Sequence, residues 1–385
     1  MTLLFLGLPP EQLGRYNLIQ TLASLPTKVH SALVGVPLQA MVPAADAAER
    51  PRVIAGLRAI SWLLCLLAAV GTCTAAVVAG VGGPVVGGAA AVFAVGMMMR
   101  DRVQTELHAR FRHPKSLAVA LVGAGLALGL AVLAQATGRF GAVAASGAMG
   151  GGALAAAAWA LGGDRVPRVE PLRDSLGRIQ HLVGPGLANA GAMWARTTLY
   201  SMGGWFALGA EPLGRISMAR TVVIGAAGLV FVGTSLAVVP RVAAAIDARD
   251  RRGLARLLAL QTAAGLLAVF GISGLVLLGF GLAADMVPEG YGGLRPLLLG
   301  WSADAGLLAL TLGPGSLMAA LLAFRESAAC NAVAGVAAVV VAPLLVRSHG
   351  ALGMLEAQCI ADGTFCVLLA GASGWALARA WREPR

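Results

Sequence analysis

Long apolar runs, separated by short polar segments, occupy almost the whole chain. A membrane-spanning helix needs about 20 predominantly apolar residues, and the runs are long enough for this. They predict eleven spans, near residues 15–42, 54–80, 84–108, 116–137, 140–162, 183–209, 214–240, 255–283, 296–323, 328–346 and 351–378. The apolar start, "MTLLFLGL", is too short to cross a bilayer. The pattern predicts an all-α polytopic membrane protein.

Composition supports this interpretation. Only 12% of the 385 residues are charged and 58% are hydrophobic, whereas soluble domains carry about 25% charged residues. The loops leave no room for a large soluble domain. None of the five cysteines belongs to a C-x-x-C pair, so we expect no disulfide framework, metal site or cofactor.

Positive charge is distributed unevenly between alternate loops. Twenty-one of the 29 Lys and Arg residues lie in or next to one set of loops, five lie in the opposite set and three lie in spans. Basic loops are usually cytoplasmic, so this asymmetry predicts a cytoplasmic C-terminus. The net charge of +11 is then explained by orientation and by contact with membrane lipids, without nucleic acid.

The chain contains an internal duplication. Residues 13–21 read "LGRYNLIQT" and residues 213–221 read "LGRISMART"; further on, "ARFRHPKSLAVALVG" from Ala109 answers "LAFRESAACNAVAGV" from Leu322. The matches fall at equivalent places in two six-span units, which share one orientation. This predicts two parallel six-helix bundles related by a pseudo-two-fold axis, a transporter design with the substrate site between the halves. Duplication as a mere route to a larger bundle is the alternative.

The same register predicts three parts: an N-terminal lobe at 1–164, a cytoplasmic linker at 165–182 and a C-terminal lobe at 183–385. About 28 residues run from Gly184 to Leu213, but only twelve precede Leu13. We therefore expect the first helix to be truncated. Either the true start lies upstream or this is a naturally shortened copy, and the second case would favour an inactive remnant or scaffold.

Several motifs are similar to those of one family. They are "LGRY" at 13–16, "PRVAAAIDARD" at 240–250, "PEGY" at 288–291 and "HGALG" at 349–353. In order and spacing they resemble the MOP exporter superfamily, specifically the O-antigen type of polysaccharide and oligosaccharide-lipid flippase. The resemblance implies two six-helix lobes around a central cavity, with lipid-linked saccharides as substrates. The chain departs from the family at Ile216, where Tyr is frequent, and in its first span, which contributes to the family's cavity.

A polar stripe runs along the first full span. Asn17, Gln20, Ser24 and Lys28 fall within a sector of roughly 100° on a helix. One interpretation is a cavity wall with Lys28 as a cationic contact for substrate. The alternative is hydrogen bonding between helices, with Lys28 reaching toward the headgroups.

Two arginines lie inside later spans, where a charge costs about 2.5–3.5 kcal/mol on insertion scales. Arg196 is a candidate to bind a diphosphate, because a guanidinium makes bidentate contacts with phosphate; the alternative is an ion pair with Asp304 or Asp362. Arg220 takes the place of Gln20 in the second repeat, either as a second cavity contact or as an arginine reaching the outer headgroups. Asn189, next to Ala188, is a further candidate cavity residue.

Three acids also lie in spans: Asp304, Glu356 and Asp362. They could bind a coupling cation, accept a proton, contact sugar hydroxyls or act as counterions to the arginines, and the sequence leaves these roles open. No G-x-x-x-x-G-K-[ST] loop for ATP is present, and no catalytic triad is recognisable. The chain is therefore not expected to be an enzyme.

These observations lead to one functional hypothesis. The protein would translocate a polyprenyl-diphosphate-linked saccharide across the bacterial inner membrane by alternating access, in the company of glycan polymerase or ligase machinery. The main alternative is a multidrug or small-molecule exporter of the same superfamily. A membrane-embedded glycan polymerase or ligase would usually carry a long outer loop, and none is predicted here.

Overall fold

The computed structural model describes residues 8–35, 37–38, 42, 46, 48–78, 83–110, 112–162, 172–282, 289–291, 293–321 and 323–382. The apolar start at residues 1–7 and residues 165–171 of the predicted linker lie outside these residues, and the rest of the linker, 172–182, is helical.

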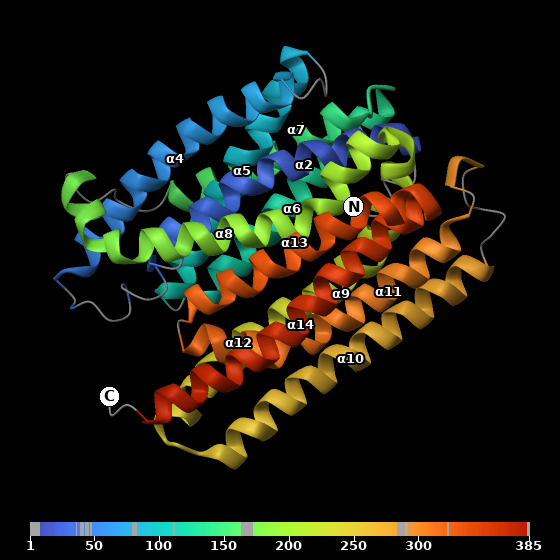
Figure 1. Ribbon diagram of the computed structural model, residues 1–385. Coiled ribbons are helices and arrows are strands. Elements are labelled where there is room, and N and C mark those ends of the chain that lie inside the picture. The colour runs from blue at the N-terminus through green and yellow to red at the C-terminus, as the bar shows by residue number, and fades with distance from the viewer. Residues whose placement is uncertain are drawn as a thin grey trace. The chain divides into compact units, whose positions relative to one another are not determined.

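The described residues form helices almost throughout (Figure 1). The α-helices are α2 (Pro10–His30), α4 (Arg50–Val78), α5 (Pro84–Ala109), α6 (His113–Ala136), α7 (Ala142–Leu161), α8 (Leu172–Leu208), α9 (Ala210–Asp247), α10 (Arg251–Leu282), α11 (Leu294–Leu310), α12 (Leu312–Ala320), α13 (Phe324–His349) and α14 (Ala351–Arg382). A π-helical turn, Ser31–Gly35, continues α2, and a 3₁₀ turn, Glu289–Tyr291, precedes α11. Within the described ranges, eight helical segments are long and apolar enough to cross a membrane. The prediction of an all-α polytopic membrane protein is confirmed.

One predicted span is interrupted. The run at 296–323 forms two helices, α11 and α12, which meet at Thr311. Pro314 lies in the first turn of α12 and has no N–H to donate to the preceding turn. The hydroxyl of Thr311 instead donates to the carbonyl oxygen of Leu308 at 2.7 Å. The hydropathy pattern predicted the correct length of this span and missed its break.

Contacts divide the chain into two compact units, and the division falls inside two helices. Unit 1 holds residues 15–194 and unit 2 holds residues 4–14 and 195–385, apart from three residues at the extreme N-terminus. Both α2 and α8 therefore contribute to each unit. The predicted lobe boundaries at 164 and 183 stay a prediction.

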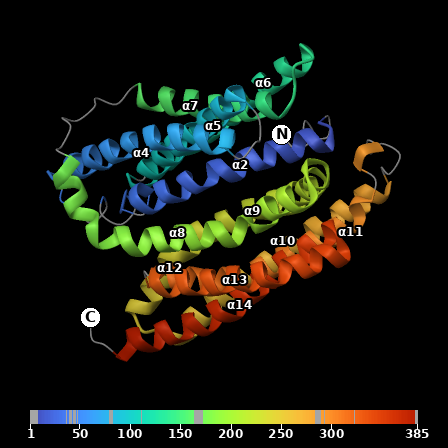
Figure 2. The same ribbon diagram turned by 45° about the horizontal axis from the view of Figure 1, so that its top comes forward.

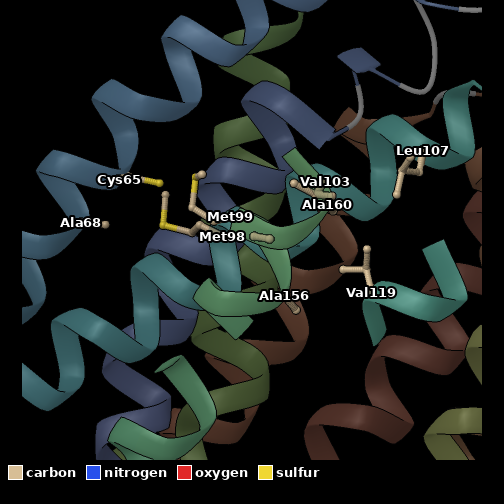
Figure 3. Packing of buried hydrophobic residues seen from close by; sticks show 10 residues of the cluster. Cys65, Ala68, Met98, Met99, Val103, Leu107, Val119, Ala156 and Ala160 are labelled. Atoms are coloured by element: carbon tan, nitrogen blue, oxygen red, sulfur yellow. The ribbon is translucent and has the colours of Figure 1, made fainter. Parts of the chain in front are cut away.

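The core of unit 1 is built by α4, α5, α6 and α7. Figure 3 shows Cys65 of α4 facing Met98 and Met99 of α5, with Ala156 of α7 close by. Val103 continues the same apolar face along α5. Because lipid tails are as apolar as these side chains, van der Waals packing of this face against its neighbours, rather than removal from water, stabilises the unit.

Small residues let the helices of unit 1 approach closely. A Cβ at Gly96 of α5 would overlap the backbone of Gly150 on α7, and a Cβ at Gly150 would overlap the backbone at Val92 and Phe93. Such contacts are typical of membrane helices, where close backbone packing replaces the hydrophobic effect. The many glycines of this chain thus have a packing role at these crossings.

In unit 2, α13 and α14 lie side by side along most of their length (Figure 2). Gly350 joins them with a φ of 58°, a left-handed conformation that favours glycine. Gly353 then lies directly against the backbone of Leu345 and Val346, where no Cβ would fit. The "HGALG" motif is therefore the tight turn and first crossing of this helix pair.

The repeated "LGR" motif forms a reciprocal crossing within unit 2. A Cβ at Gly14 would overlap the carbonyl oxygen of Ala210, and a Cβ at Gly214 would overlap the carbonyl oxygen of Pro10. Gly14 of α2 thus packs directly against the first residue of α9, and Gly214 of α9 packs directly against the first residue of α2. The motif has a packing reason that the sequence alone did not reveal.

The tyrosine of the "PEGY" motif fastens the start of the chain to unit 2. The Tyr291 hydroxyl donates to the carbonyl oxygen of Leu8 at 2.7 Å. Burial raises the pKa of Tyr291 to about 12. The hydroxyl therefore stays protonated at neutral pH and remains a hydrogen-bond donor.

Candidate functional site

Unit 2 buries an ion pair to which three helices contribute. Arg196 of α8 and Asp362 of α14 are 4% and 2% exposed, and their Nη1 and Oδ1 atoms form a salt bridge. The Nε of Arg196 also donates to the Oδ1 of Asn331 on α13 at 2.8 Å. A buried charge is tolerated where it is paired and hydrogen-bonded, and both conditions hold here.

Neighbouring side chains fix both members of this pair. Gln358 donates to the second oxygen of Asp362 at 2.8 Å, from one turn earlier on α14. The Arg196 guanidinium lies 4.0 Å from the ring centroid of Phe365, a cation–π distance. Asn331 donates in turn to the carbonyl oxygen of Ser327 at 2.9 Å. Of the two roles considered for Arg196 from the sequence, the structure shows the ion pair with Asp362. Its contact with a diphosphate stays a prediction.

Asp304 is the second buried acid of unit 2. It is 1% exposed, and its Oδ1 has no hydrogen-bond partner among the described residues. It interacts electrostatically with both Arg220 and Arg196. A buried carboxylate oxygen without a donor is costly, so this position suits a proton or a bound cation.

Arg220 is held by aromatic rings. Its guanidinium carbon lies 5.2 Å from the ring centroid of Tyr200 and 5.7 Å from that of Trp301. The two rings meet edge to face, with centroids 5.1 Å apart, and the Trp301 Nε1 donates to the carbonyl oxygen of Ile216 at 3.0 Å. In the described part of the chain no carboxylate forms a salt bridge with Arg220, which is partly exposed. Its donors are therefore accessible to an anion.

Glu356 lies elsewhere in unit 2. Its carboxylate is 2.7 Å from the Nδ1 of His349, and both side chains are about half exposed. It shares α14 with Asp362 but not its buried surroundings. The structure therefore separates Glu356 from the two buried acids with which the sequence grouped it.

The candidate residues of unit 1 line the polar side of α2. Gln20 donates to the Tyr16 hydroxyl at 2.6 Å, and Ser24 donates to the carbonyl oxygen of Thr21 at 2.7 Å. Asn17 is buried, and Lys28 is partly exposed. Much of this stripe thus satisfies its hydrogen bonds within its own helix, and its role in a cavity stays a prediction.

The first half of α8 also belongs to unit 1. Its Trp194 donates from Nε1 to the carbonyl oxygen of Thr21 at 3.1 Å, which ties α8 to α2. Asn189 lies earlier on the same helix and is partly exposed.

Sequence reasoning missed several members of these networks. Asn331, Gln358 and Phe365 hold the buried ion pair, yet none was singled out. Their signal was present, because an amide inside a predicted span is unusual and needs a partner. Arg58 and Arg102 were counted as loop charges, although both side chains are buried.

Among the described residues, no group of three or more His, Cys, Asp or Glu side chains could hold a metal ion.

The sequence matches no family model and no curated protein. Solved structures of similar fold exist, however. An inward-facing multidrug resistance MATE family transporter of the MOP superfamily aligns over 98% of this chain and 93% of its own, with a TM-score of 0.72 and 15% identity. The outward-facing form of such a transporter aligns over 98% and 90%, with a TM-score of 0.67 and 16% identity.

A third structure has the same fold. It is a MOP superfamily transporter from Pyrococcus furiosus, for which a reversed polarity of the binding pocket suggests a different function. It aligns over 100% of this chain and 91% of its own, with a TM-score of 0.72 and 13% identity. At these identities the comparisons establish the fold: this chain has the fold of the MATE transporters of the MOP superfamily.

Proposed function

We propose that the protein is a transporter that translocates a polyprenyl-diphosphate-linked saccharide across the bacterial inner membrane by alternating access. The observation that carries this proposal is Arg220. The guanidinium of Arg220, a partly exposed residue, lies near two aromatic rings and forms no salt bridge in the described residues, although Asp304 is close enough to interact electrostatically. An arginine pre-oriented in this way can offer two parallel donors to a phosphate group.

In this proposal Arg196 acts as a positioning residue. Its charge is matched by Asp362 and its Nε is used by Asn331. It would fix α8, and with it the Tyr200 ring beneath Arg220. Of the two arginines in the spans, Arg196 and Arg220, only Arg220 would then contact the anion.

Deletion of the gene tests the substrate. If the protein is a flippase, the deletion strain accumulates the lipid-linked saccharide on the cytoplasmic leaflet and loses the finished glycan. Arg220→Gln should reproduce that phenotype, while Arg220→Lys should retain part of the activity because the charge remains. Arg215→Gln is the matched control, because Arg215 is exposed and pairs only with Glu211 in the contacts described.

A small-molecule exporter is the second candidate, and Asp304 favours it. A buried carboxylate with an unpartnered oxygen suits a cationic substrate or a coupling cation, and the structural neighbours include multidrug transporters. Under this alternative, Asp304→Asn should abolish drug resistance, Arg220→Gln should retain it, and the deletion strain should show no glycan defect. That combination would exclude the flippase.

A further inference from the structure

A basic cluster lies inside unit 1, where α4 packs against α5. It consists of Arg58 and Trp62 on α4, Arg102 and Glu106 on α5, and Arg110 directly after the end of α5. The residues of each helix are four positions apart, which places them on one helical face. The cluster borders the packing shown in Figure 3: Arg102 lies one turn after Met98 on α5 and interacts electrostatically with Cys65 of the same core.

The carboxylate of Glu106 interacts with all three arginines of this cluster. Arg58 makes two hydrogen bonds with Glu106, at 3.0 Å from Nε and 2.6 Å from Nη2. Arg110 forms a salt bridge with the same Glu106 at 2.6 Å, and Arg102 interacts electrostatically with both Glu106 and Arg58. Arg58 and Arg110 are therefore each paired with a carboxylate, whereas Arg102 forms no salt bridge among the described residues.

Arg102 has buried hydrogen-bond donors without a partner. It is 1% exposed, and its Nε and Nη2 have no hydrogen-bond partner among the described residues. Its guanidinium carbon lies 5.9 Å from the centroid of the Trp62 ring, and Arg102 interacts electrostatically with His30 and Cys65. Buried charged donors are costly when they remain unpaired, so the cluster lacks an acceptor of negative charge.

The second repeat shows that the helix pair does not require these charges. In the register that aligns Ala109 with Leu322, Arg102, Glu106 and Arg110 correspond to Gly315, Ala319 and Ala323. The equivalent helices of unit 2 thus pack without any of the three. The cluster is therefore an addition to the fold of unit 1.

The surroundings indicate where a ligand would enter. The Trp62 side chain is 56% exposed on the outer face of α4, and Arg110 is 26% exposed. Exposed tryptophans of membrane proteins lie at the headgroup level. The charge asymmetry of the loops predicts that this end faces the cytoplasm, where the leaflet carries anionic lipids.

We propose that this cluster binds the phosphate group of an anionic phospholipid, with Arg102 donating to the phosphate oxygens, Arg110 at the entrance and Trp62 against the lipid. The site is independent of the transported substrate. Lipid bound there would satisfy the unpaired donors and tie the cytoplasmic ends of α4 and α5 together.

The test uses the purified full-length chain in a neutral detergent. Binding of phosphatidylglycerol and of phosphatidylcholine is titrated by native mass spectrometry, and Tm is followed in parallel. We expect phosphatidylglycerol to bind more tightly than phosphatidylcholine and to raise Tm. Arg102→Gln should weaken the phosphatidylglycerol binding by about tenfold or more, since a hydrogen bond to a charged group is lost.

Two further variants make the result decisive. Arg252→Gln removes one exposed basic residue from the predicted cytoplasmic side and should leave the binding unchanged. Arg110→Gln, at the exposed edge, should weaken binding and provides the answer if Arg102→Gln does not fold. Equal binding by Arg110→Gln and the unmodified chain, or equal binding of the two lipids, would overturn the proposal.

Inorganic phosphate distinguishes the two sources of the phosphate group. If phosphate alone raises Tm in the unmodified chain and not in Arg102→Gln, the cluster recognises the phosphate group without a lipid tail. If only the phospholipid does so, the tail and Trp62 contribute to binding. With either ligand, an equal rise in Tm for Arg102→Gln and the unmodified chain would contradict the proposal that Arg102 binds the phosphate group.

Discussion

At the scale of single residues, the buried charges of unit 2 fall into two kinds. Arg196 and Asp362 satisfy each other and are supported by Asn331 and Gln358. Asp304 and Arg220 are close enough to interact electrostatically but form no salt bridge among the described residues. The first pair is suited to holding helices in place, whereas the second combines a buried carboxylate with a partly exposed guanidinium and forms no salt bridge.

The paired kind predicts a strongly coupled double-mutant cycle. Arg196→Gln or Asp362→Asn alone leaves an uncompensated buried charge and should destabilise the protein by about 3–5 kcal/mol. The double variant should lose less than the sum of the two, because it leaves no unpaired charge. Thermal unfolding in detergent measures all three.

Additive losses would show that the two side chains do not depend on each other. Glu356→Gln is a suitable control, because its carboxylate pairs with His349 at an exposed turn. Exposed pairs contribute only about 0–1 kcal/mol, so this variant should unfold close to the unmodified chain.

Sequence reasoning identified both arginines and both buried acids of the candidate site, and it wrongly grouped Glu356 with them. It could not assign the partners, because Arg196 lies 166 positions from Asp362 and the choice between Asp304 and Asp362 depends on how α8, α11 and α14 pack. It also could not see that Tyr200 and Trp301 hold Arg220. Such contacts depend on tertiary structure, whereas the presence of a charge in an apolar run does not.

At the scale of the helices, apolar run length was a sufficient guide. Each predicted span overlaps a described helix or helix pair, and eight of the eleven match helical segments that are long and apolar enough to cross a membrane. The ends differ because a helix continues beyond the hydrocarbon: α9 extends seven residues past Pro240, to Asp247. The break at Thr311 was missed because hydropathy does not register the missing donor of Pro314.

The reciprocal glycine crossing gives a prediction for two helices at once. Gly14→Ala and Gly214→Ala each place a methyl group against backbone atoms, and such overpacking should cost about 1–3 kcal/mol. Gly225→Ala, on α9 with no atom within 4 Å of its added Cβ, should be neutral or slightly stabilising, since alanine favours helix. Thermal unfolding of the three variants compares them directly.

An unchanged Tm for both crossing variants would mean that the helices can separate at this point without loss. A loss for one variant and not the other would show that the two repeats have diverged in how closely they pack. Only a loss for both, with Gly225→Ala unaffected, agrees with the structure.

At the scale of the whole molecule, the loop charges predict the orientation in the membrane. Arg139 lies in a turn of the poorly charged set, and Arg252 lies in a turn of the basic set. Both residues are exposed. In a chain whose five native cysteines are replaced, Arg139→Cys should react with a membrane-impermeant maleimide from outside intact cells, and Arg252→Cys should react only after permeabilisation.

The reverse labelling pattern would place the basic loops outside and would remove the cytoplasmic assignment of the C-terminus. Labelling of both positions from outside would contradict a single orientation. The fold itself would be unaffected by either result, because it rests on the helices and on the similarity to MOP superfamily structures.

The crossing of Gly14 and Gly214 is self-complementary, since each copy of the motif supplies both the gap and the backbone that enters it. A polypeptide with only one copy would present the same surface to a second molecule of itself, as an isologous contact of a homodimer. The chain can thus be understood as such a dimer joined into one gene. A symmetric pair of identical molecules would carry the same residue at both equivalent positions, whereas this single chain carries Gln20 at one and Arg220 at the other.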